Sequence, residues 1–458
     1  MNDIRPFRGL RFDEKVVGPL GRVVCPPYDV ISPDEQERLH ASSPYNVVRL
    51  ELGMEAPGDY ATHNRYSRAA ATLQRWMREG ALVEEAEPAL YLYEQRFTHS
   101  GSTLVRRGLL ANLRLAPWEE GVVLPHEETM AGPKADRLEL MRATACDISP
   151  IFLLFDDPSG TVAGLMEEAA RRDPDALADT GDGQLHSLWV LTGDVSRRLA
   201  AALRQPQLYV ADGHHRYETE LAYKEERRRM ALAAGSALSA SSEEPWDLHS
   251  EAPYDFGMML LVDARDPGLV VLPTHRIVRG VGADALLQME KRLQESFLVD
   301  ELPLEGMGVE EAAERMLARL GEVGRDGAGL GLYRPGRKAA ILRPRPGQEG
   351  LLVSSGSLVG RDGRQRPMLD VDLLHEGILA PTLGIGPEQL KAGSHVVYTR
   401  SAMEAMSAVE SGQGMVAFLL NPTRVDQVLE TARAGGRMPQ KSTYFYPKPV
   451  TGLVMSRL

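Results

Sequence analysis

The stretch "LYVADGHHRYETEL" (208–221) joins an apolar, strand-like run to a helix-like run through a short polar turn. A strand ending at Val210 and a helix starting near Tyr217 would leave the first N–H groups of that helix without acceptors inside it. Such a helix start binds phosphate well, and a glycine lets the backbone approach a ligand closely. The stretch therefore predicts a strand–turn–helix unit whose turn binds phosphate through Asp212, Gly213, His214, His215 and Arg216.

The side chains of this turn can take part in phosphate chemistry. Arg216 can fork two phosphate oxygens, and a histidine can donate a hydrogen bond or move a proton near neutral pH. Asp212 repels phosphate unless Mg²⁺ lies between them, or unless its carboxylate takes a proton from a hydroxyl. In the plainer interpretation Asp212 caps the helix, Arg216 pairs with Glu220 and the histidines lie on the surface. The residues alone leave both interpretations open.

A second polar cluster lies in "VLPHEETMAGPKADRLELM" (123–141). Glu127 and Glu128 precede a predicted helix that begins near Pro133, and Lys134 and Arg137 share one face of it because they are three residues apart. A carboxylate beside cations can activate a hydroxyl next to a phosphate. A solvated helix start with ordinary charges is the alternative.

Two further stretches add cations and hydroxyls. "LPTHRIV" (272–278) places His275 and Arg276 after a predicted strand, where they are either functional or simply a polar strand end. Side chains in "MPQKSTYFYPK" (438–448) suit phosphate or carboxylate binding: Lys441, Ser442, Thr443 and Lys448. The spacings of a Walker loop, a GxSxG elbow, an HExxH site and a C₂H₂ site are absent, so we expect no tightly held structural metal.

Composition limits the function classes. A chain of 458 residues is long enough for two or three domains. Its net charge of −12 opposes wrapping of DNA. The two cysteines exclude a disulfide framework and fit a reducing cytosol. No apolar leader and no run of about 18 apolar residues occurs, so we expect a cytoplasmic protein without a membrane span.

The periodicity predicts mixed α/β (α+β) structure. We expect a helix within 60–82, paired strands at 88–98 and 106–115, a buried strand at 149–157, a hairpin over 254–278, a helix over 423–436 and a final strand over 442–455. Small and polar residues at 231–253 predict a linker or mobile loop. The expected organisation is an N-terminal lobe (1–230), this linker, and a second mixed α/β lobe (254–458).

Several of these stretches resemble a known family. End to end, the chain resembles a widespread prokaryotic family known as domain of unknown function ten-fifteen. The resemblance rests on "RPFRGLRFD", "VVCPPYDVIS", "SPYNVVRLEL", "RRGLLANLRL", "HEETMAGPKADRLELM", "ADGHHRYETEL", "LPTHRIV" and "MPQKSTYFYPK". The family name implies no activity.

A more distant resemblance does imply one. "ADGHHR" resembles the nucleotide-binding strand-to-helix turn of the ParB and sulfiredoxin superfamily. The free-serine kinases within it carry an Asp-Gly-x-His-Arg turn and an upstream "HEE". The resemblance implies a ParB/sulfiredoxin-like core over about 105–230. It also implies a base at Glu127 or Glu128, of which we prefer Glu127, with Asp212 assisting or holding Mg²⁺, and with His215 and Arg216 on the phosphates.

The chain departs from that superfamily in three places. Residues 158–206 form an extra segment between the two motifs, and no counterpart of the ParB DNA-binding helices is recognisable. Histidine stands where sulfiredoxin needs a cysteine. Chromosome partitioning and sulfinic-acid repair are therefore disfavoured.

These observations lead to a functional hypothesis with alternatives. The hypothesis is a phosphotransferase that uses ATP or ADP with Mg²⁺ to phosphorylate the hydroxyl of a small metabolite, such as free serine. Loops at 274–276 and 441–448 would complete the pocket and hold the substrate. The alternatives are a nucleotide-binding regulatory protein without turnover, and a phosphohydrolase or nuclease that uses the same acids with water.

Overall fold

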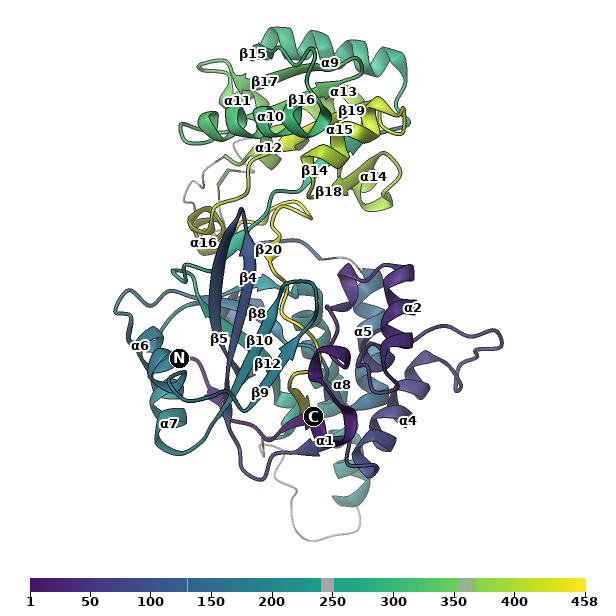
Figure 1. Cartoon of the computed structure of the whole chain (residues 1–458), viewed down its shortest axis with the longest axis vertical. Coiled ribbons are helices and arrows are strands. Elements are labelled where there is room, and N and C mark those ends of the chain that lie inside the picture. The colour runs from purple at the N-terminus through teal and green to yellow at the C-terminus, as the bar shows by residue number, and fades with distance from the viewer. Residues whose placement is uncertain (130, 240–250, 354–357, 360–362, 364–365, 367) are drawn as a thin grey trace. The chain divides into compact units, whose positions relative to one another are not determined.

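The computed structural model describes residues 1–458 except 130, 240–250, 354–357, 360–362, 364–365 and 367. The chain divides into two compact units (Figure 1). Unit 1 comprises Met1–Leu124, Met130–Val270 and Pro447–Leu458, and unit 2 comprises Pro125–Thr129 and Val271–Tyr446. This division differs from the expected lobes 1–230 and 254–458. Part of the expected linker, 240–250, lies outside the described residues.

Unit 1 is built around a mixed sheet, which in the described part of the chain has nine strands. Pairs β8–β12 and β6–β11 are parallel and the other pairs are antiparallel. The strands run in the order β6 (Val123–Leu124), β11 (Leu208–Asp212), β8 (Ile151–Phe155), β12 (Phe256–Asp263), β5 (Ser102–Arg114), β4 (Leu90–His99), β10 (Leu185–Leu191) and β9 (Ala176–Asp179), with β1 (Ile4–Arg5) beside β5. The predicted mixed α/β class is confirmed.

Local sequence signals explain several elements of unit 1. Strands β4 and β5 form the predicted hairpin, which turns at Ser100 and Gly101, both with positive φ. Helix α4 (Arg65–Arg78) lies within the predicted range, and the side chain of Asn64 caps its first turn. The other helices and short helical turns are α1 (Glu14–Val17), η1 (Leu20–Arg22), η2 (Tyr28–Val30), α2 (Pro33–Ser42), α3 (Val48–Glu51), η3 (Trp118–Glu120), α5 (Ala131–Thr144), α6 (Thr161–Ala169), α7 (Gly193–Ala202), α8 (His214–Ser239) and η4 (Pro253–Asp255).

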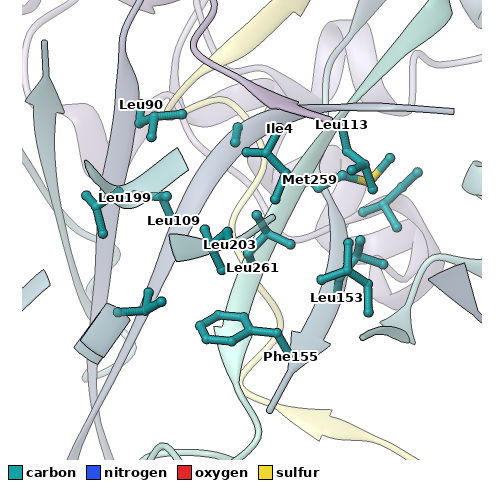
Figure 2. Packing of buried hydrophobic residues seen from close by; sticks show 14 of the residues in the cluster. Ile4, Leu90, Leu109, Leu113, Leu153, Phe155, Leu199, Leu203, Met259 and Leu261 are labelled. Atoms are coloured by element: carbon teal, nitrogen blue, oxygen red, sulfur yellow. The ribbon is translucent and has the colours of Figure 1, made fainter. Parts of the chain in front are cut away.

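The core of unit 1 lies on the side of this sheet that α6 and α7 cover. Leu109 from β5, Phe155 from β8 and Leu261 from β12 are fully buried there (Figure 2). Leu199 of α7 packs against the same cluster. Burying such a side chain stabilises the fold by about 1.5–3 kcal/mol, so this cluster holds the strand that leads into the polar turn, β11, in place.

A second sheet of unit 1 uses the end of the chain. Its strands are β3 (Leu82–Glu84), β2 (Gly9–Phe12), β21 (Met455–Arg457) and β7 (Cys146–Asp147). The last residues therefore pack with the first ones. The predicted single strand over 442–455 is wrong: within it only β20 (Phe445–Tyr446) and the first residue of β21 are strand, because Pro447 and Pro449 lack N–H donors. Strand β20 pairs with β13 (Val270–Val271).

Unit 2 contains an antiparallel sheet, six-stranded in its described residues. The strand order is β15 (Phe297–Leu302), β17 (Lys338–Pro344), β16 (Leu330–Arg334), β19 (Val416–Leu420), β14 (His275–Val278) and β18 (Val396–Thr399). The predicted hairpin over 254–278 is wrong, because β12 and β14 belong to different sheets. The two strands each find other partners, which periodicity alone does not identify.

Helices supply the rest of the unit 2 core. Met316 and Leu320 of α10 (Val309–Val323) pack with Met406 and Val409 of α15 (Ala402–Glu410) against buried strand residues. The remaining helical elements are α9 (Ala283–Ser296), α11 (Glu349–Leu352), α12 (Asp370–Leu374), η5 (His375–Leu379), α13 (Ala380–Leu383), α14 (Pro387–Ala392) and α16 (Val425–Arg433). Helix α16 lies within the predicted 423–436.

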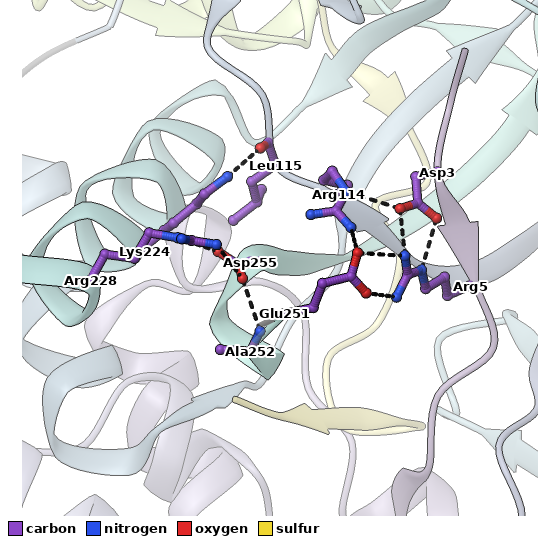
Figure 3. Close-up of polar contacts among 9 residues, drawn as sticks. All are labelled: Asp3, Arg5, Arg114, Leu115, Lys224, Arg228, Glu251, Ala252 and Asp255. Atoms are coloured by element: carbon purple, nitrogen blue, oxygen red, sulfur yellow. Dashed lines mark hydrogen bonds and ion pairs between the residues drawn. The ribbon is translucent and has the colours of Figure 1, made fainter. Parts of the chain in front are cut away.

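Helix α8, which begins at the polar turn, is tied to unit 1 along its length. Arg228 donates to Asp255 at 2.8 and 2.7 Å, and Lys224 donates to the carbonyl of Leu115 at 2.7 Å (Figure 3). After the segment 240–250 the chain is held by Glu251, whose carboxylate accepts from Arg5 and Arg114. Among the described helices, none is long and apolar enough to cross a membrane.

Candidate functional site

The turn between β11 and α8 has the predicted strand–turn–helix geometry. Gly213 has a φ of +96°, which side-chain-bearing residues rarely adopt, and the N–H of Tyr217 donates to its carbonyl at 2.9 Å to close the first helical turn. A Cβ at Gly213 would lie 3.1 Å from the guanidinium of Arg216. Glycine therefore allows Arg216 to fold back over the turn. The helix begins at His214, three residues earlier than the sequence suggests.

Asp212 is held between two cations. Nη2 of Arg216 donates to Oδ2 of Asp212 at 2.7 Å, and Nζ of Lys448 donates to Oδ1. The exposed fractions of the Asp212, Arg216 and Lys448 side chains are 17%, 10% and 8%. Burial alone would raise the pKa of Asp212, but Lys448 and Arg216 outweigh burial and hold that pKa well below its usual range. Asp212 is thus an ionised anchor for cations and a weak proton acceptor near neutral pH.

Lys448 reaches this turn because the final segment returns to unit 1. Nε2 of Gln95 donates to the carbonyl of Lys448 at 3.1 Å, and Arg106 donates to the carbonyl of Pro447. Cys25 and Thr451 form a β-bridge farther along. Lys448 also lies 3.8 Å from Asp29, so the "PPYD" stretch belongs to the same site. We call Asp212, Arg216, Lys448 and Asp29 the turn cluster.

Arg216 is fixed on its far side as well. Its Nη1 donates to the carbonyl of Pro150 at 2.6 Å and to Oγ of Ser149 at 3.3 Å. Ser149 in turn donates to Oε1 of Glu51 at 3.2 Å. Burial lowers the pKa of Arg216, but Asp212 and Asp29 outweigh it and raise the pKa above its usual value. The guanidinium is therefore a permanent cation with a set orientation.

Arg137 of α5 lies in an adjoining network. Its Nη1 donates to the carbonyl of Glu51 at 2.8 Å, its Nε donates to Oδ2 of Asp136 at 2.8 Å, and its guanidinium lies 4.1 Å from the ring centre of Tyr28. Asp136 also accepts from Tyr66 at 2.7 Å. Because Arg137 is 7% exposed, these contacts make it part of the wall of the site.

Lys134 faces a different partner. Its Nζ donates to Oε2 of Glu218 at 2.9 Å, and Oε1 of Glu218 accepts from the indole of Trp118 at 3.2 Å. Lys134 is 37% exposed, whereas Arg137 is buried. The spacing of Lys134 and Arg137 predicts a shared face, but in the structure the two side chains contact different partners. Phosphate binding by them stays a prediction.

Farther along α8, Glu220 is an acid whose pKa is shifted upward, in the opposite direction to that of Asp212. Glu220 and Asp147 line a small cavity of about 40 Å³ together with Arg216 and Arg137. Oε2 of Glu220 and Oδ1 of Asp147 have no hydrogen-bond partner among the described residues. Burial raises the pKa of Asp147 to about 7 and that of Glu220 well above its usual value. At neutral pH this pair therefore keeps a proton. Arg216 pairs with Asp212 and not with Glu220, so the plainer interpretation of that pair is wrong.

In unit 2 the "HEE" stretch lies beside the "MPQKST" stretch. Met438 donates its N–H to the carbonyl of His126 at 2.7 Å, and Glu127 and Met438 form a parallel β-bridge. Nε2 of the buried His126 lies 3.1 Å from Oγ1 of Thr443. Two motifs separated by about three hundred residues thus form one strip of backbone, which explains why Pro125–Thr129 belongs to unit 2.

The remaining predicted substrate residues are mostly engaged inside unit 2. Arg276 is 1% exposed and donates to the carbonyls of Thr274 and, at 3.1 Å, Lys441. His275 is also 1% exposed, and its Nδ1 accepts the N–H of Leu420 at 3.2 Å. Oγ of Ser442 donates to the carbonyl of Pro439 at 2.5 Å. These contacts give the side chains a packing role, and substrate binding by them stays a prediction.

The structure sorts the predicted site residues into two sets. Unit 1 holds Lys134, Arg137, Asp212, Gly213, His214, His215, Arg216 and Lys448, and unit 2 holds Glu127, Glu128, His275, Arg276, Lys441, Ser442 and Thr443. The sequence predicts that the loop at 441–448 completes the pocket, and Lys448 of that loop contacts Asp212. Sequence reasoning missed Tyr28, Asp29, Glu51 and Ser149. The "PPYD" stretch was a usable signal for the first two, whereas a lone buried glutamate or serine gives none.

A divalent metal fits this arrangement only with help from a ligand. In the described parts of the chain no group of three or more His, Cys, Asp or Glu side chains could hold a metal ion. Both carboxylate oxygens of Asp212 already accept from cations. Mg²⁺ usually takes one or two carboxylates together with substrate phosphates and water. Most ligands of such an ion would therefore have to come from the phosphates.

Comparisons with known proteins find similarities at low identity. A free serine kinase in complex with AMP is 12% identical, with a TM-score of 0.35 over 76% of this chain and 92% of that chain. A conserved hypothetical protein from Pyrococcus furiosus is 14% identical, with a TM-score of 0.33 over 76% and 95%. SbnI with a C-terminal truncation from Staphylococcus aureus is 9% identical, with a TM-score of 0.33 over 75% and 87%.

Sequence comparison adds one assignment. No curated protein matches the chain. The profile of a family described as "Protein of unknown function (DUF1015)" matches residues 4–359, which is well over half of the chain and includes both the "HEE" and the "ADGHHR" stretches. The chain therefore belongs to the DUF1015 family.

Proposed function

We propose that this protein is a nucleotide-dependent phosphotransferase that acts on the hydroxyl of a small metabolite. The observation that carries the proposal is the turn cluster, in which a buried, ionised Asp212 holds Lys448 and Arg216 at the first turn of the 26-residue helix α8. Phosphoryl transfer needs positioned positive charge more than covalent chemistry. A helix start with two oriented cations supplies that charge.

In this proposal the turn cluster binds the phosphates of ATP or ADP. Arg216 is held on three sides and cannot swing, so it offers a fixed direction to a phosphate oxygen. Lys448 can exchange one carboxylate oxygen of Asp212 for a phosphate oxygen without leaving the turn. His214 and His215 stand in the first turn of α8 and supply donors beside them. Mg²⁺, when bound, neutralises phosphate charge, mainly through phosphate oxygens.

The proposed base is Glu127, on the basis of the resemblance of "HEE" to the free-serine kinases. Its backbone is fixed by the bridge to Met438, and His126 beside it is held by Thr443. By that resemblance, the Glu127 carboxylate would accept the proton of the acceptor hydroxyl. Asp212 is unsuited to that step, because its cations keep its pKa low. Serine is the first acceptor to test.

Nucleotide binding without turnover is the second candidate. The same low pKa of Asp212 favours it, because the best-ordered acid of the turn cluster cannot take a proton near neutral pH. Glu127→Gln separates the two functions. For a kinase the rate falls by about 10²–10⁴ while nucleotide affinity stays unchanged. For a binding protein nothing changes.

Phosphorus NMR on the full chain tests the proposal. The sample contains Mg²⁺ and ATP or ADP, with and without a panel of amino and hydroxy acids led by serine. We expect a new phosphomonoester signal that requires an acceptor and falls at least about 100-fold in Asp212→Asn. Asp194→Asn is the matched control, because Asp194 is 72% exposed and pairs only with its neighbour Arg197 among the described ion pairs.

Three results would contradict the kinase. Nucleotide loss without an acceptor would identify a phosphohydrolase. Broadened nucleotide signals without turnover would identify the binding protein. Full activity in Asp212→Asn would separate the reaction from the turn cluster. Glu139→Gln, an exposed change in α5, is the matched control for Glu127→Gln.

A further inference from the structure

Unit 2 contains a cavity beside the "HEE" stretch that the proposed binding of nucleotide phosphates by the turn cluster does not use. Its volume is about 420 Å³, within the range of small-molecule sites, and every lining residue belongs to unit 2. Lining residues come from the helical segment that begins at His375, from the loop and helix around Ile385 and Leu390, and from the strip at Met438–Gln440. We call it the unit 2 cavity.

Two uncharged polar groups of the unit 2 cavity lack partners. Nε2 of His375 and Nε2 of Gln440 are both buried, and neither has a hydrogen-bond partner among the described residues. His375 is 8% exposed, and burial lowers its pKa to about 3, so its ring is neutral. A buried polar atom without a partner costs about 1–3 kcal/mol. A ligand with hydrogen-bonding atoms at its edge would remove that cost.

The backbone under His375 is unusual in the same place. Helix α12 continues through a π-helical turn, η5 (His375–Leu379), into α13, and the π turn begins at His375. A π turn inserts one extra residue into a helix and is retained mostly at functional sites. Its first two residues, His375 and Glu376, both line the cavity. This observation is independent of the unpartnered atoms.

The charged side chains that line the cavity balance in sign: three are basic and three acidic, namely Arg366, Lys391, Arg437, Glu128, Asp372 and Glu376. Arg366 and Asp372 form a bidentate pair at 2.5 and 2.9 Å, and each side chain is 2% exposed. Asp372 also accepts the N–H of Leu369 at 3.0 Å. Because Arg366 and Asp372 neutralise each other, an ionised group placed beside them would lose water without gaining a net counter-charge. The inner part of the ligand must therefore be neutral.

The other walls are aliphatic. Ile385 and Leu390 come from one segment and Met438 and Pro439 from another, and Tyr398 adds an aromatic ring. Hydroxyls of a sugar or polyol would lose water against such walls, whereas the faces of a flat ring would bury apolar area there. Lys391 and Glu128 are exposed, and Glu376 and Arg437 are half-buried. These charged residues can meet polar substituents of the ligand at the solvent side.

From these contacts we infer that the unit 2 cavity binds a nucleobase, as a nucleoside or nucleotide, with the ring against the aliphatic walls and its edge bonded to His375 and Gln440. An uncharged heteroaromatic ring with donors and acceptors on its edge is the class that satisfies all four observations. None of the residues that line the unit 2 cavity belongs to the turn cluster. The inference holds whether or not the protein transfers phosphate.

Isothermal titration calorimetry of the full chain with adenosine, guanosine, cytidine and uridine tests the inference. We expect at least one nucleoside to bind with a Kd below about 1 mM. Ala380→Trp, which fills the cavity from an exposed position, should weaken that binding at least tenfold. Ala392→Trp is the matched control, since Ala392 is exposed and does not line the cavity, and it should change nothing.

Further variants keep the result interpretable. Gln440→Met keeps the side-chain length and removes the amide, so it should weaken binding about tenfold. Asp212→Asn, in the turn cluster, should leave nucleoside binding unchanged. The inference fails if no nucleoside binds, if Ala380→Trp and Ala392→Trp behave alike, or if Asp212→Asn abolishes the binding. It also fails if serine or inorganic phosphate, titrated as counter-probes, is the ligand that Ala380→Trp displaces.

Discussion

The turn cluster of unit 1 and the cavity of unit 2 differ in whether their buried polar groups have partners. In the turn cluster Asp212 accepts from both Arg216 and Lys448. In the unit 2 cavity the neutral His375 and Gln440 each keep a buried nitrogen without a partner among the described residues. One site is electrostatically complete before a ligand arrives, and the other is incomplete.

The difference follows from the cost of burial. An unpaired buried charge costs several kcal/mol, so a chain that places cations at a helix start must also supply a carboxylate. An unpartnered neutral group costs about 1–3 kcal/mol, which a stable unit can tolerate. A site for an ionic ligand is therefore recognised by exchangeable ion pairs, and a site for a neutral ligand by buried atoms that lack partners.

The largest expected effect breaks the turn cluster. Asp212→Ala leaves Arg216 and Lys448 without their shared carboxylate, and we expect the free energy of unfolding of unit 1 to fall by about 3–5 kcal/mol. Urea unfolding followed by tryptophan fluorescence measures this, because Trp76 and Trp189 are buried in unit 1 and unit 2 has no tryptophan. Asp194→Ala should leave the midpoint unchanged. Equal effects of the two variants would mean that the pairing is not stabilising.

The second effect uses the acid pair below the same helix. Burial raises the pKa of Asp147 to about 7, above its value in the unfolded chain. The folded state therefore holds a proton that the unfolded state has lost above pH 4, and the associated stability declines as the pH rises from about 4 to about 7. Asp147→Asn should remove this loss, so that its stability relative to wild type rises by about 2 kcal/mol from pH 5 to pH 8.

Denaturation at pH 5, 6, 7 and 8 measures that difference, with Asp194→Asn as the control. Parallel stability curves for Asp147→Asn and wild type would show that the pair titrates as it does in water. Asp212 behaves in the opposite sense: its pKa is lowered, so its stabilising contribution is lost only in acid below its ordinary range.

Much of the fold follows from local patterns. The strand–turn–helix at Asp212, the hairpin β4–β5 and helix α4 all carry their signals within a few residues, such as Gly101 and the cap at Asn64. What failed was pairing over long separations. Strands β12 and β14 follow each other in the sequence but pair in different sheets, and no local pattern determines which distant strand each will meet.

The same distinction between local sequence signals and long-range contacts applies to the residues of the candidate site. The residues of the turn were predictable because strand, glycine and helix start are contiguous. Lys448 was expected in the loop that completes the pocket, but its direct contact with Asp212 was not predictable, because it depends on Gln95 and Arg106 holding the final segment. Glu51 and Ser149 act only through Arg137 and Arg216, so nothing in their own sequence context distinguishes them from other buried polar residues.

A third effect compares one glycine from each unit. Gly213→Ala forces a residue with a side chain to a φ of +96° and brings its Cβ to 3.1 Å from Arg216. Gly384→Ala also adopts a positive φ, +65°, but its Cβ has no neighbour within 4 Å. Since left-handed backbone alone costs about 1–2 kcal/mol, Gly213→Ala should be the more destabilising of the two. Thermal unfolding by circular dichroism compares them, and the reverse order would contradict the tight turn.

A fourth effect concerns His375 in the unit 2 cavity. His375→Leu removes a buried nitrogen that has no partner among the described residues, at similar side-chain volume. We expect the stability of the protein to stay within about 1 kcal/mol of wild type, and not on the lower side. Chemical denaturation followed by far-UV circular dichroism measures this. A loss of about 2 kcal/mol or more would mean that His375 is bonded in solution, and the contrast between the two sites would disappear.

The smallest expected effect concerns Lys134, which is not a member of the turn cluster. Lys134 is 37% exposed and pairs with Glu218 at 2.9 Å, so Lys134→Gln should change the free energy of unfolding by less than about 1 kcal/mol. If Lys134 also binds phosphate, as its place in the helix that follows the "HEE" stretch predicts, nucleotide affinity should fall severalfold while stability stays the same. Calorimetric titration with ATP and ADP measures that split, with Lys15→Gln as an exposed control in α1. Unchanged nucleotide affinity would mean that Arg216 and Lys448, whose charges are buried and oriented, bind the phosphates without Lys134. The phosphate site would then consist only of cations that are already paired with Asp212 before the ligand binds.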